Sequence, residues 1–378
     1  MLLKGADIYV YKLDNDVFDA IGQINQYTSL IWPNKFIGCS EFELNAPVTS
    51  ENKILIKEGN IIWCGGDNAA IIEIIQVDTD EDGKKVYKVK GKSLEKMLTT
   101  RIIWGTYNCV NKNASTAMYE VVNNNCVNPS DANRKIPFLE CAADEHLGKN
   151  IHTQKTGGEV YDFLESIATD ESLGFDILFK PKDKKLIFKV NQGVDRTDLT
   201  KPDVVIFSTD LEDIITSSYY KNAESIKNIA LVAGEGTSAE RKKIVSGDNN
   251  LKGFDRKEIY VDARDIQSEV QDDEGATTTM DEDDYLIMLD NRGKEKLAEY
   301  GVTESFEAQM RVVGNVQYKY GADYHKGDRV IVQDTDIGVQ VFATISEISE
   351  NYDDEYELEI TFGFSHPTLI QKIKRQIK

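Results

Sequence analysis

Three stretches of the sequence combine residue types that carry out chemistry in other proteins, and the first suggests calcium binding. Residues 78–83 (DTDEDG) have the alternating aspartates and the glycine that open an EF-hand loop. Such a loop needs a bidentate glutamate at its twelfth position, where this chain has Val89 inside a strand-like run. No helical pattern flanks the stretch, so we interpret it as the tip of a β-hairpin.

The second stretch is a glycine-containing turn that could be mistaken for a phosphate-binding loop. Residues 234–241 (GEGTSAER) follow an apolar run that predicts a strand. Their spacing matches neither G-x-x-x-x-G-K-S/T nor G-x-G-x-x-G, so the backbone cradle that grips a phosphate has no basis here. We interpret the stretch as a sharp exit from a strand, with Arg241 in a subunit contact.

The third stretch places Cys141, Asp144 and His146 close together, and carboxylates adjoin at residues 170–171 and 282–284. Catalytic pairs are assembled by the fold, so proximity along the chain adds little. With 65 acidic residues, adjacent carboxylates arise by chance. The four histidines form no His-x-x-x-His pair. The sequence therefore predicts no catalytic, cofactor-binding or metal-binding residue, and it favours a protein that is not an enzyme.

The cysteines and the apolar runs indicate where the protein is made. Five cysteines at irregular spacing argue against a disulfide framework and against structural zinc. Reduced, mostly buried thiols made in a cytoplasm are expected. The first residues lack the apolar core of a signal peptide, and no run reaches membrane-spanning length, so we expect no stable membrane insertion.

The charge of the chain is strongly negative. Lys and Arg total 44 against 65 Asp and Glu, a formal net charge of -21. Such a chain repels phosphate backbones, which argues against specific nucleic-acid binding through a basic face. The same charge suits a surface along which nucleic acid slides without sticking, although solubility is the plainer interpretation.

Strand patterns dominate both ends of the chain. In the first hundred residues, residues 71–77 and 85–90 flank an Asp-Gly turn and predict a hairpin. Near the other end, residues 330–332 follow the Gly327-Asp328 turn, and residues 342–348 and 357–362 continue as strands. The last fifth of the chain therefore predicts a small β-barrel.

The middle of the chain mixes helices with strands. Its predicted elements are helices over residues 114–123, 159–169 and 285–300, a hairpin of residues 175–179 with 185–190, an acidic mobile loop over 271–284, and a basic amphipathic helix over 367–378. The expected fold class is α+β and mainly β. The predicted domains are residues 1–107 (N-terminal β-barrel), 108–203 (α+β), 204–240 with 305–364 (second β-barrel), 241–304 (polar insertion with a helix) and 365–378 (C-terminal basic helix).

Short motifs follow one another along the chain in a recognisable order. Residues 42–47 (FELNAP) lead to residues 61–63 (IIW), the hairpin, and residues 89–103 (VKGKSLEKMLTTRII); residues 233–241, 323–330 and 360–363 follow. This order resembles the siphovirus tail-protein family of the ReqiPepy type, with its G-x-x-L-x-x-L-L-x-x-R signature. The resemblance implies structural rather than catalytic roles for Gly91, Leu94, Leu98, Arg101, Gly327 and Asp328.

Proteins of this family are similar to the central hub of phage and phage-like, bacteriocin or PBSX-type, tail baseplates. The resemblance implies two tail-tube-like barrels in each chain, and a homotrimer that presents six barrels to a six-fold tail tube. It also implies contacts with the tube or distal tail protein, the tape-measure protein, and distal spike or fibre proteins. DNA would pass through the ring passively. The expected location is the virion, after assembly in the bacterial host cytoplasm.

Two other classes of function compete with the hub. A tail-associated cell-wall hydrolase would use acidic residues of the central α+β region, and a carbohydrate- or receptor-binding module would use exposed tyrosines. The sequence lacks any Ser/His, Cys/His or zinc signature, so the hydrolase ranks second.

Overall fold

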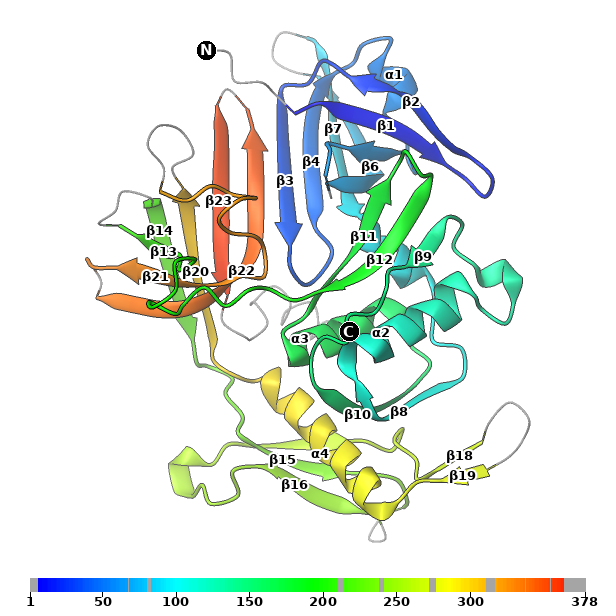
Figure 1. Ribbon diagram of the computed structural model, residues 1–378, viewed down its shortest axis with the longest axis vertical. Coiled ribbons are helices and arrows are strands. Elements are labelled where there is room, and N and C mark those ends of the chain that lie inside the picture. Colours follow the sequence, from blue (N-terminus) through cyan, green and yellow to red (C-terminus); the bar gives the residue numbers. More distant parts are fainter. Residues whose placement is uncertain are drawn as a thin grey trace.

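The computed structural model describes residues 6–66, 68–79, 83–209, 214–237, 241–271, 277–310, 317–336, 338–353 and 355–363. The fold is mainly β with a few helices, as the sequence predicts, and Figure 1 shows a long β-sheet region above a helical middle and a small lower unit. Residues 365–378, predicted as a basic helix, and residues 272–276 of the predicted acidic loop lie outside the described residues.

The first hundred residues form one half of the main sheet around a core of their own. Its elements are β1 (Ile8–Leu13), β2 (Phe18–Ile24), β3 (Ser29–Lys35), β4 (Glu41–Pro47), α1 (Asn52–Leu55), β5 (Ile61–Trp63), β6 (Ala69–Thr79), β7 (Lys85–Ser93) and the 3₁₀ turn η1 (Leu94–Thr100). Alternate residues point inward, such as Leu44 of β4 and Val89 of β7, and they bury one shared cluster. The predicted hairpin is confirmed as β6 with β7, where Ile75 pairs with Val89.

The α+β unit follows and packs two helices against a small sheet. Its elements are β8 (Thr106–Asn113), α2 (Ala114–Val122), the π turn η2 (Asn123–Val127), the 3₁₀ turn η3 (Ala132–Arg134), β9 (Leu139–Cys141), β10 (Asn150–Thr156), α3 (Val160–Glu171), β11 (Gly174–Lys180) and β12 (Lys185–Asn191). The predicted hairpin is confirmed as β11 with β12. Val160, Leu164 and Ile167 of α3 are buried, as the helical spacing requires.

The second half of the main sheet comes from the C-terminal part of the chain. Its elements are β13 (Ile206–Ser208), β14 (Ile214–Asn222), β20 (Thr303–Met310), β21 (Arg329–Asp334), β22 (Val339–Tyr352) and β23 (Tyr356–Gly363). Inward residues of these strands form a separate core in which the ring of Phe362 contacts those of Phe207 and Phe306. Each half of the sheet therefore has its own hydrophobic interior.

A small satellite unit hangs below the helical middle (Figure 1). Its elements are β15 (Ile229–Ala233), β16 (Lys243–Gly247), the 3₁₀ turn η5 (Gly253–Asp255), β17 (Glu258–Asp262), β18 (Glu269–Gln271), β19 (Thr277–Thr279) and α4 (Glu282–Ala298). The sequence prediction assigned residues 229–233 to the second barrel, but β15 pairs instead with β16 and β17. The reason is packing, because Ala230 and Val232 of β15 bury themselves against α4.

The two halves of the main sheet are joined by backbone hydrogen bonds. Strand order runs β14-β20-β23-β22-β3-β4-β7-β6-β5-β1-β2 in a 13-stranded sheet, with β21 and β13 attached beside β22. Two separate closed barrels were expected from the sequence. Within the described residues the pairing instead follows an open path between β14 and β2 and closes no barrel.

The length of β22 explains the junction. Its first part pairs with β21 along one edge, and past the irregularity at Ile345 the strand continues beyond β21. The freed edge, Glu347–Tyr352, pairs antiparallel with β3. A strand longer than its neighbour therefore offers the edge to which the N-terminal half attaches.

No helix of the described residues is long and apolar enough to cross a membrane.

Gly91 of β7 supplies the first prediction. A Cβ added at this glycine would lie 1.8 Å from the carbonyl oxygen of Ile71 and 2.7 Å from the ring of Phe42. We expect Gly91→Ala to lower the free energy of unfolding by about 2–4 kcal/mol, because backbone on β6 must move. Gly59→Ala is the control, since its methyl group meets nothing within 4 Å, although its φ of +81° costs roughly 1 kcal/mol. Equal losses in urea unfolding of the two variants would contradict this explanation.

Candidate functional site

The two halves of the main sheet and the α+β unit meet around the ammonium group of Lys326. It donates hydrogen bonds to Oδ1 of Asn34 (2.6 Å) and to the carbonyl of Lys35 (3.2 Å) on β3, and to Oδ1 of Asp176 on β11 (2.6 Å). The side chains of Lys326 and Asp176 are only 16% and 14% exposed. One cation therefore links the C-terminal half to both other units.

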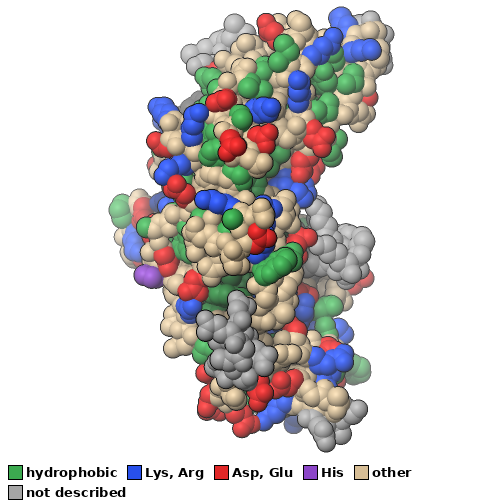
Figure 2. Space-filling view, turned by 90° about the vertical axis from the view of Figure 1, so that its right-hand side faces the viewer, with side chains coloured by type: hydrophobic (Ala, Val, Ile, Leu, Met, Phe, Trp, Pro, Cys, Tyr) green, Lys and Arg blue, Asp and Glu red, His purple; other side chains and the backbone are tan. Residues whose placement is uncertain are grey.

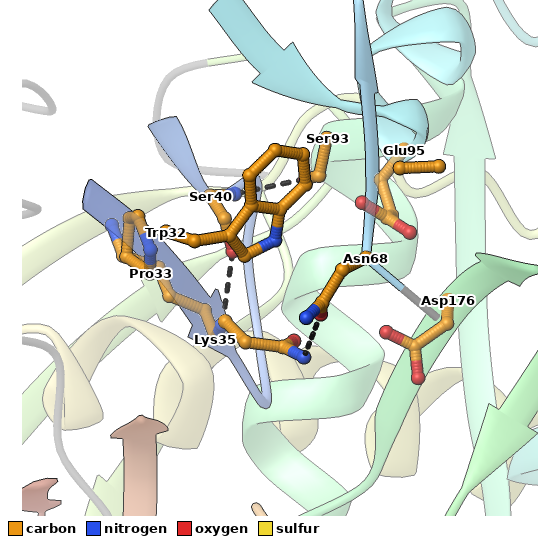
Figure 3. Close-up of a pocket in the computed structure, with 10 residues that line it drawn as sticks. Trp32, Pro33, Lys35, Ser40, Asn68, Ser93, Glu95 and Asp176 are labelled. Carbon is orange, nitrogen blue, oxygen red and sulfur yellow. Dashed lines mark hydrogen bonds between the residues drawn. The ribbon is translucent and has the colours of Figure 1, made fainter. Parts of the chain in front are cut away.

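A small polar cavity adjoins this ion pair (Figure 3). Its volume is about 20 Å³, and its lining includes Glu95, Asp176 and Ser93. Glu95 is buried and accepts a hydrogen bond from the backbone N–H of Ile177 (2.7 Å). Burial, followed by repulsion from Asp176, raises the pKa of the Glu95 carboxyl. A space of this size suits one water molecule and no substrate.

A second polar link joins the halves directly. The side-chain amide of Asn34 on β3 donates to Oδ1 of Asn68 (3.2 Å), and the Asn68 amide donates to Oε1 of Glu350 on β22 (3.3 Å). Glu350 also accepts hydrogen bonds from the hydroxyls of Tyr352 and Tyr356. The junction is thus a connected polar network around the β22–β3 ladder.

Three glycines allow the backbones at this junction to touch. Gly327 has a φ of +89°, and a Cβ there would lie 2.4 Å from the ring of Phe36. A Cβ on Gly174 would strike the same ring, and one on Gly193 would lie 1.7 Å from the carbonyl oxygen of Gly327. The packing therefore requires glycine at these positions.

Asp328 holds the segment around Val194 and Arg196, which passes close to Gly327. Its carboxylate is buried and accepts hydrogen bonds from the backbone N–H of Val194 (2.8 Å), from that of His325 (3.1 Å) and from Nε of Arg196 (2.6 Å). The turn that the sequence singled out at residues 327–328 is thus an attachment point for the end of the α+β unit.

The exposed face of the main sheet crosses the junction without a break. One row of paired residues runs from Glu357 through Asn351 to Ile31, and on through Glu43 and Lys90 to Ile74. These side chains are exposed or half-buried. Glu359 projects beside Glu357 on the same face. The two halves therefore present a single continuous surface that carries several carboxylates, a lysine paired with Glu43, and two exposed isoleucines.

The residues of the family signature in the first half, Leu94, Leu98 and Arg101, make packing and backbone contacts with the α+β unit. Leu94 and Leu98 are buried under the α+β unit. Arg101 donates from Nε to the carbonyl of Arg134 (2.5 Å) and from Nη1 to that of Thr100 (3.1 Å). These contacts attach η1 to the neighbouring unit.

The other candidate motifs take local roles. Arg241 folds back on its own strand, donating to the carbonyls of Ala233 and Gly234 and to Asp262 (2.6 Å), and its side chain is 10% exposed. The expected subunit contact through this arginine is therefore corrected to an intramolecular one. Val89, the twelfth position of the calcium-like stretch, is buried in a strand, and residues 80–82 lie outside the described residues.

Asp144 and His146 lie in a loop that is hydrogen-bonded to the start of α2, the helix that Asn113 caps. The Asp144 carboxylate accepts hydrogen bonds from the hydroxyls of Ser115 (2.5 Å) and Thr116 in the first turn of α2, and these bonds lower its pKa despite partial burial. Nδ1 of His146 lies 3.1 Å from Oδ2 of Asp144, and the imidazole ring is exposed. Burial raises the pKa of Cys141 to about 11, so its thiol stays protonated at neutral pH.

The carboxylate pairs do not gather in one place. Glu171 accepts from the backbone N–H of Lys149 (3.0 Å), Glu282 pairs with Lys242, and Asp284 lies 3.8 Å from His152. Among the described residues, no three His, Cys, Asp or Glu side chains group closely enough to hold a metal ion. All five cysteines are free thiols.

The mainly β fold of this chain is similar to that of several tail proteins of known structure. Similar structures are a tail protein from Neisseria meningitidis MC58 (TM-score 0.53, 15% identity, 96% of this chain and 97% of that chain) and the 43 kDa tail protein of prophage MuSo2 from Shewanella oneidensis (0.53, 11%, 95% and 98%). Prophage tail protein gp18 from Listeria monocytogenes EGD-e is a third (0.52, 9%, 98% and 98%).

The family is established by the sequence model that matches the chain. Residues 7–364 match the model of the Siphovirus ReqiPepy6 Gp37-like proteins, so the chain belongs to this family. The resemblance read from the motif order is thereby confirmed. None of the curated proteins compared matches the chain.

Sequence reasoning missed the residues at the centre of the junction. Lys326 lies next to the Gly327-Asp328 turn, and Asp176 lies in a predicted strand, but nothing in their spacing pairs them across 150 residues. The one available signal was a charged residue, Asp176, within an otherwise apolar strand.

The buried ion pair supplies a second prediction. Lys326→Met leaves the Asp176 carboxylate buried without its cation, so we expect it to lower the free energy of unfolding by about 3 kcal/mol. Lys90→Met is the matched control, because Lys90 pairs with Glu43 on the exposed face and its loss should change stability little. Denaturant titration of both variants checks this, and a K326M protein as stable as K90M would contradict the role of the junction.

Glu95 supplies a third prediction, on pH. Its folded-state pKa is raised above the ordinary 4.5, so its contribution to stability is present below pH 4.5 and is lost as pH rises through the raised value. Glu95→Gln stays neutral and avoids this loss. We expect E95Q to be more stable than the wild type at pH 7, with the difference shrinking toward pH 4.5. Thermal unfolding across this range measures the difference.

Glu58→Gln is the control for that experiment, because the Glu58 side chain is exposed. It should follow the wild type at each pH. An E95Q protein less stable than the wild type at pH 7 would contradict the raised pKa of the Glu95 carboxyl.

Proposed function

We propose that this tail protein is a baseplate hub. Three copies form a ring that joins the six-fold tail tube to the three-fold distal spike or fibre apparatus and encloses a channel. The observation that carries the proposal is the β22–β3 ladder, which holds two β-rich halves in one fixed geometry within each chain. Three chains with two such halves would present six, so the ring would match the tube.

The two halves correspond to the proposed tube-like domains. The first comprises β1 to β7, and the second comprises β13, β14 and β20 to β23. Each has its own core, which supports treating them as two units. The satellite unit would lie outside the ring and connect it to neighbouring tail components.

The exposed face of the main sheet, which runs from Glu357 to Ile74, is the proposed channel wall. Glu357, Glu359 and Glu43 project from it, on a chain of net charge -21. Carboxylates repel the phosphate backbone, so DNA would pass the wall without binding to it. This role needs no catalytic residue and no cofactor.

The proposed partners follow from the position in the tail. They are the tail tube or distal tail protein, the tape-measure protein, and the spike or fibre proteins on the distal side. The protein would be incorporated into the virion, or into a phage-like particle, during assembly in the host cytoplasm.

The oligomeric mass is the fourth prediction and tests the proposal. Light scattering over a concentration series should give a trimer, and electron microscopy of the same sample should show three-fold rings with an open centre. A trimer is expected because three chains with two halves each would present six halves to the six-fold tube.

Two results would count against the hub. One is a protein that remains a monomer both alone and with its purified tail-tube partner. The other is release of soluble fragments from purified cell walls that a single Asp or Glu substitution in the α+β unit abolishes, which would favour the hydrolase.

A further inference from the structure

We propose that the surface around Trp104 is the contact by which one copy of this chain binds the next. The surface consists of Trp104 and Ile102 with the adjoining cations Arg101, Arg134 and Lys135. It lies on the segment that links the first half of the sheet to the α+β unit. The inference rests on the proposed ring, and it names the residues that hold the ring together.

Trp104 is exposed and yet held in place. Its side chain is 65% exposed, and the guanidinium carbon of Arg134 lies 4.7 Å from the centre of its ring. The backbone N–H of Trp104 donates to Oδ1 of Asn125 (2.9 Å). An indole fixed before binding loses little side-chain freedom on association, and tryptophan is prominent among residues that dominate interface energies.

Two hydrogen bonds to backbone carbonyls hold Arg134, the arginine stacked on Trp104, in position. Nη2 of Arg134 donates to the carbonyl of Ile102 (2.7 Å), and Arg101 donates to the carbonyl of Arg134 (2.5 Å). Nη1 of Arg134 is buried and has no hydrogen-bond partner among the described residues. The guanidinium group of Arg134 thus stacks on the Trp104 ring although its Nη1 makes no hydrogen bond there. A surface contact formed by chance would not leave a buried donor unsatisfied in this way.

A second large apolar side chain lies close to Trp104 along the chain. Ile102 is 46% exposed, so two large apolar side chains reach solvent within three residues. Lys135 of this surface also lines a hollow of about 500 Å³, together with Pro137 and Phe138. Figure 2 shows one face of the molecule, on which exposed hydrophobic side chains are scattered among charged ones. An exposed aromatic anchor with a second apolar side chain and adjoining cations suits a protein partner.

The charge of this surface points to a second copy. Arg101 and Arg134 donate only to backbone carbonyls, a threonine hydroxyl and an amide, and within the described residues no carboxylate forms an ion pair with either or with Lys135. Their positive charge is therefore left for a partner. A chain of net charge -21 supplies the complementary surface.

The test is the association constant of the full-length protein by sedimentation. We expect Trp104→Ala to weaken self-association by at least about tenfold, as removal of a central aromatic anchor does. Lys135→Glu should weaken it as well, and this effect should diminish as salt is raised. Trp104→Phe keeps an aromatic ring and should lie between the wild type and Trp104→Ala.

Phe254→Ala is the matched control, because Phe254 is a fully exposed aromatic residue on the satellite unit and outside this surface. It should associate as the wild type does. Thermal unfolding of each variant separates loss of association from loss of folding, and Lys135→Glu, at an exposed side chain, provides a second readout if Trp104→Ala unfolds.

The outcomes distinguish this inference from the hub proposal. A wild-type trimer that persists unchanged in both Trp104→Ala and Lys135→Glu overturns the inference and leaves the hub intact. A wild-type protein that stays monomeric at every concentration overturns the inference, and only its failure to assemble on the tail tube would also overturn the hub.

Discussion

The relative placement of the three larger units depends on one buried ammonium group. Lys326 accompanies the C-terminal half of the sheet, and its three acceptors belong to the N-terminal half and to the α+β unit. A buried cation needs all of its partners, because desolvation is not recovered otherwise. The ion pair therefore ties the α+β unit to the arrangement that the β22–β3 ladder gives the two halves of the sheet. Here the ion pair specifies geometry more than it adds stability.

The close backbone contacts depend on the same arrangement. Gly174, Gly193 and Gly327 have room only for hydrogen atoms at their α carbons, so the segments can approach only where the ladder and the ion pair place them. Steric exclusion and electrostatic pairing thus act together. The proposed hub would need its two halves in a fixed relation, and these contacts provide one within a single chain.

Much of the local structure was predictable from the sequence. The β6–β7 and β11–β12 hairpins follow from alternation and turn residues, and α3 follows from its apolar spacing, since these signals are local. The family was recognisable from motif order. The β22–β3 ladder was not, because strand pairing between distant segments depends on strand length and edges that the sequence pattern does not encode. Residues 229–233 were assigned to the second barrel because nothing in their own sequence shows that Ala230 and Val232 pack against α4. The partnership of Lys326 with Asp176 went unseen because it joins distant segments.

The β22–β3 ladder also has a consequence for synthesis on the ribosome. The edge of β3 emerges early, but its partner on β22 is made about 300 residues later, a delay of tens of seconds at ordinary rates of elongation. During that interval the N-terminal half has an unpaired edge, which is a template for misassociation. Pro33 lies on this edge opposite Ser349 and has no N–H to donate. The N–H of Phe36 donates to Ser346, and in the unbroken register that follows Pro33 occupies a position whose nitrogen points away from β22. The proline therefore costs the finished ladder no hydrogen bond, and the edge of the nascent half keeps all of its donors until β22 is made.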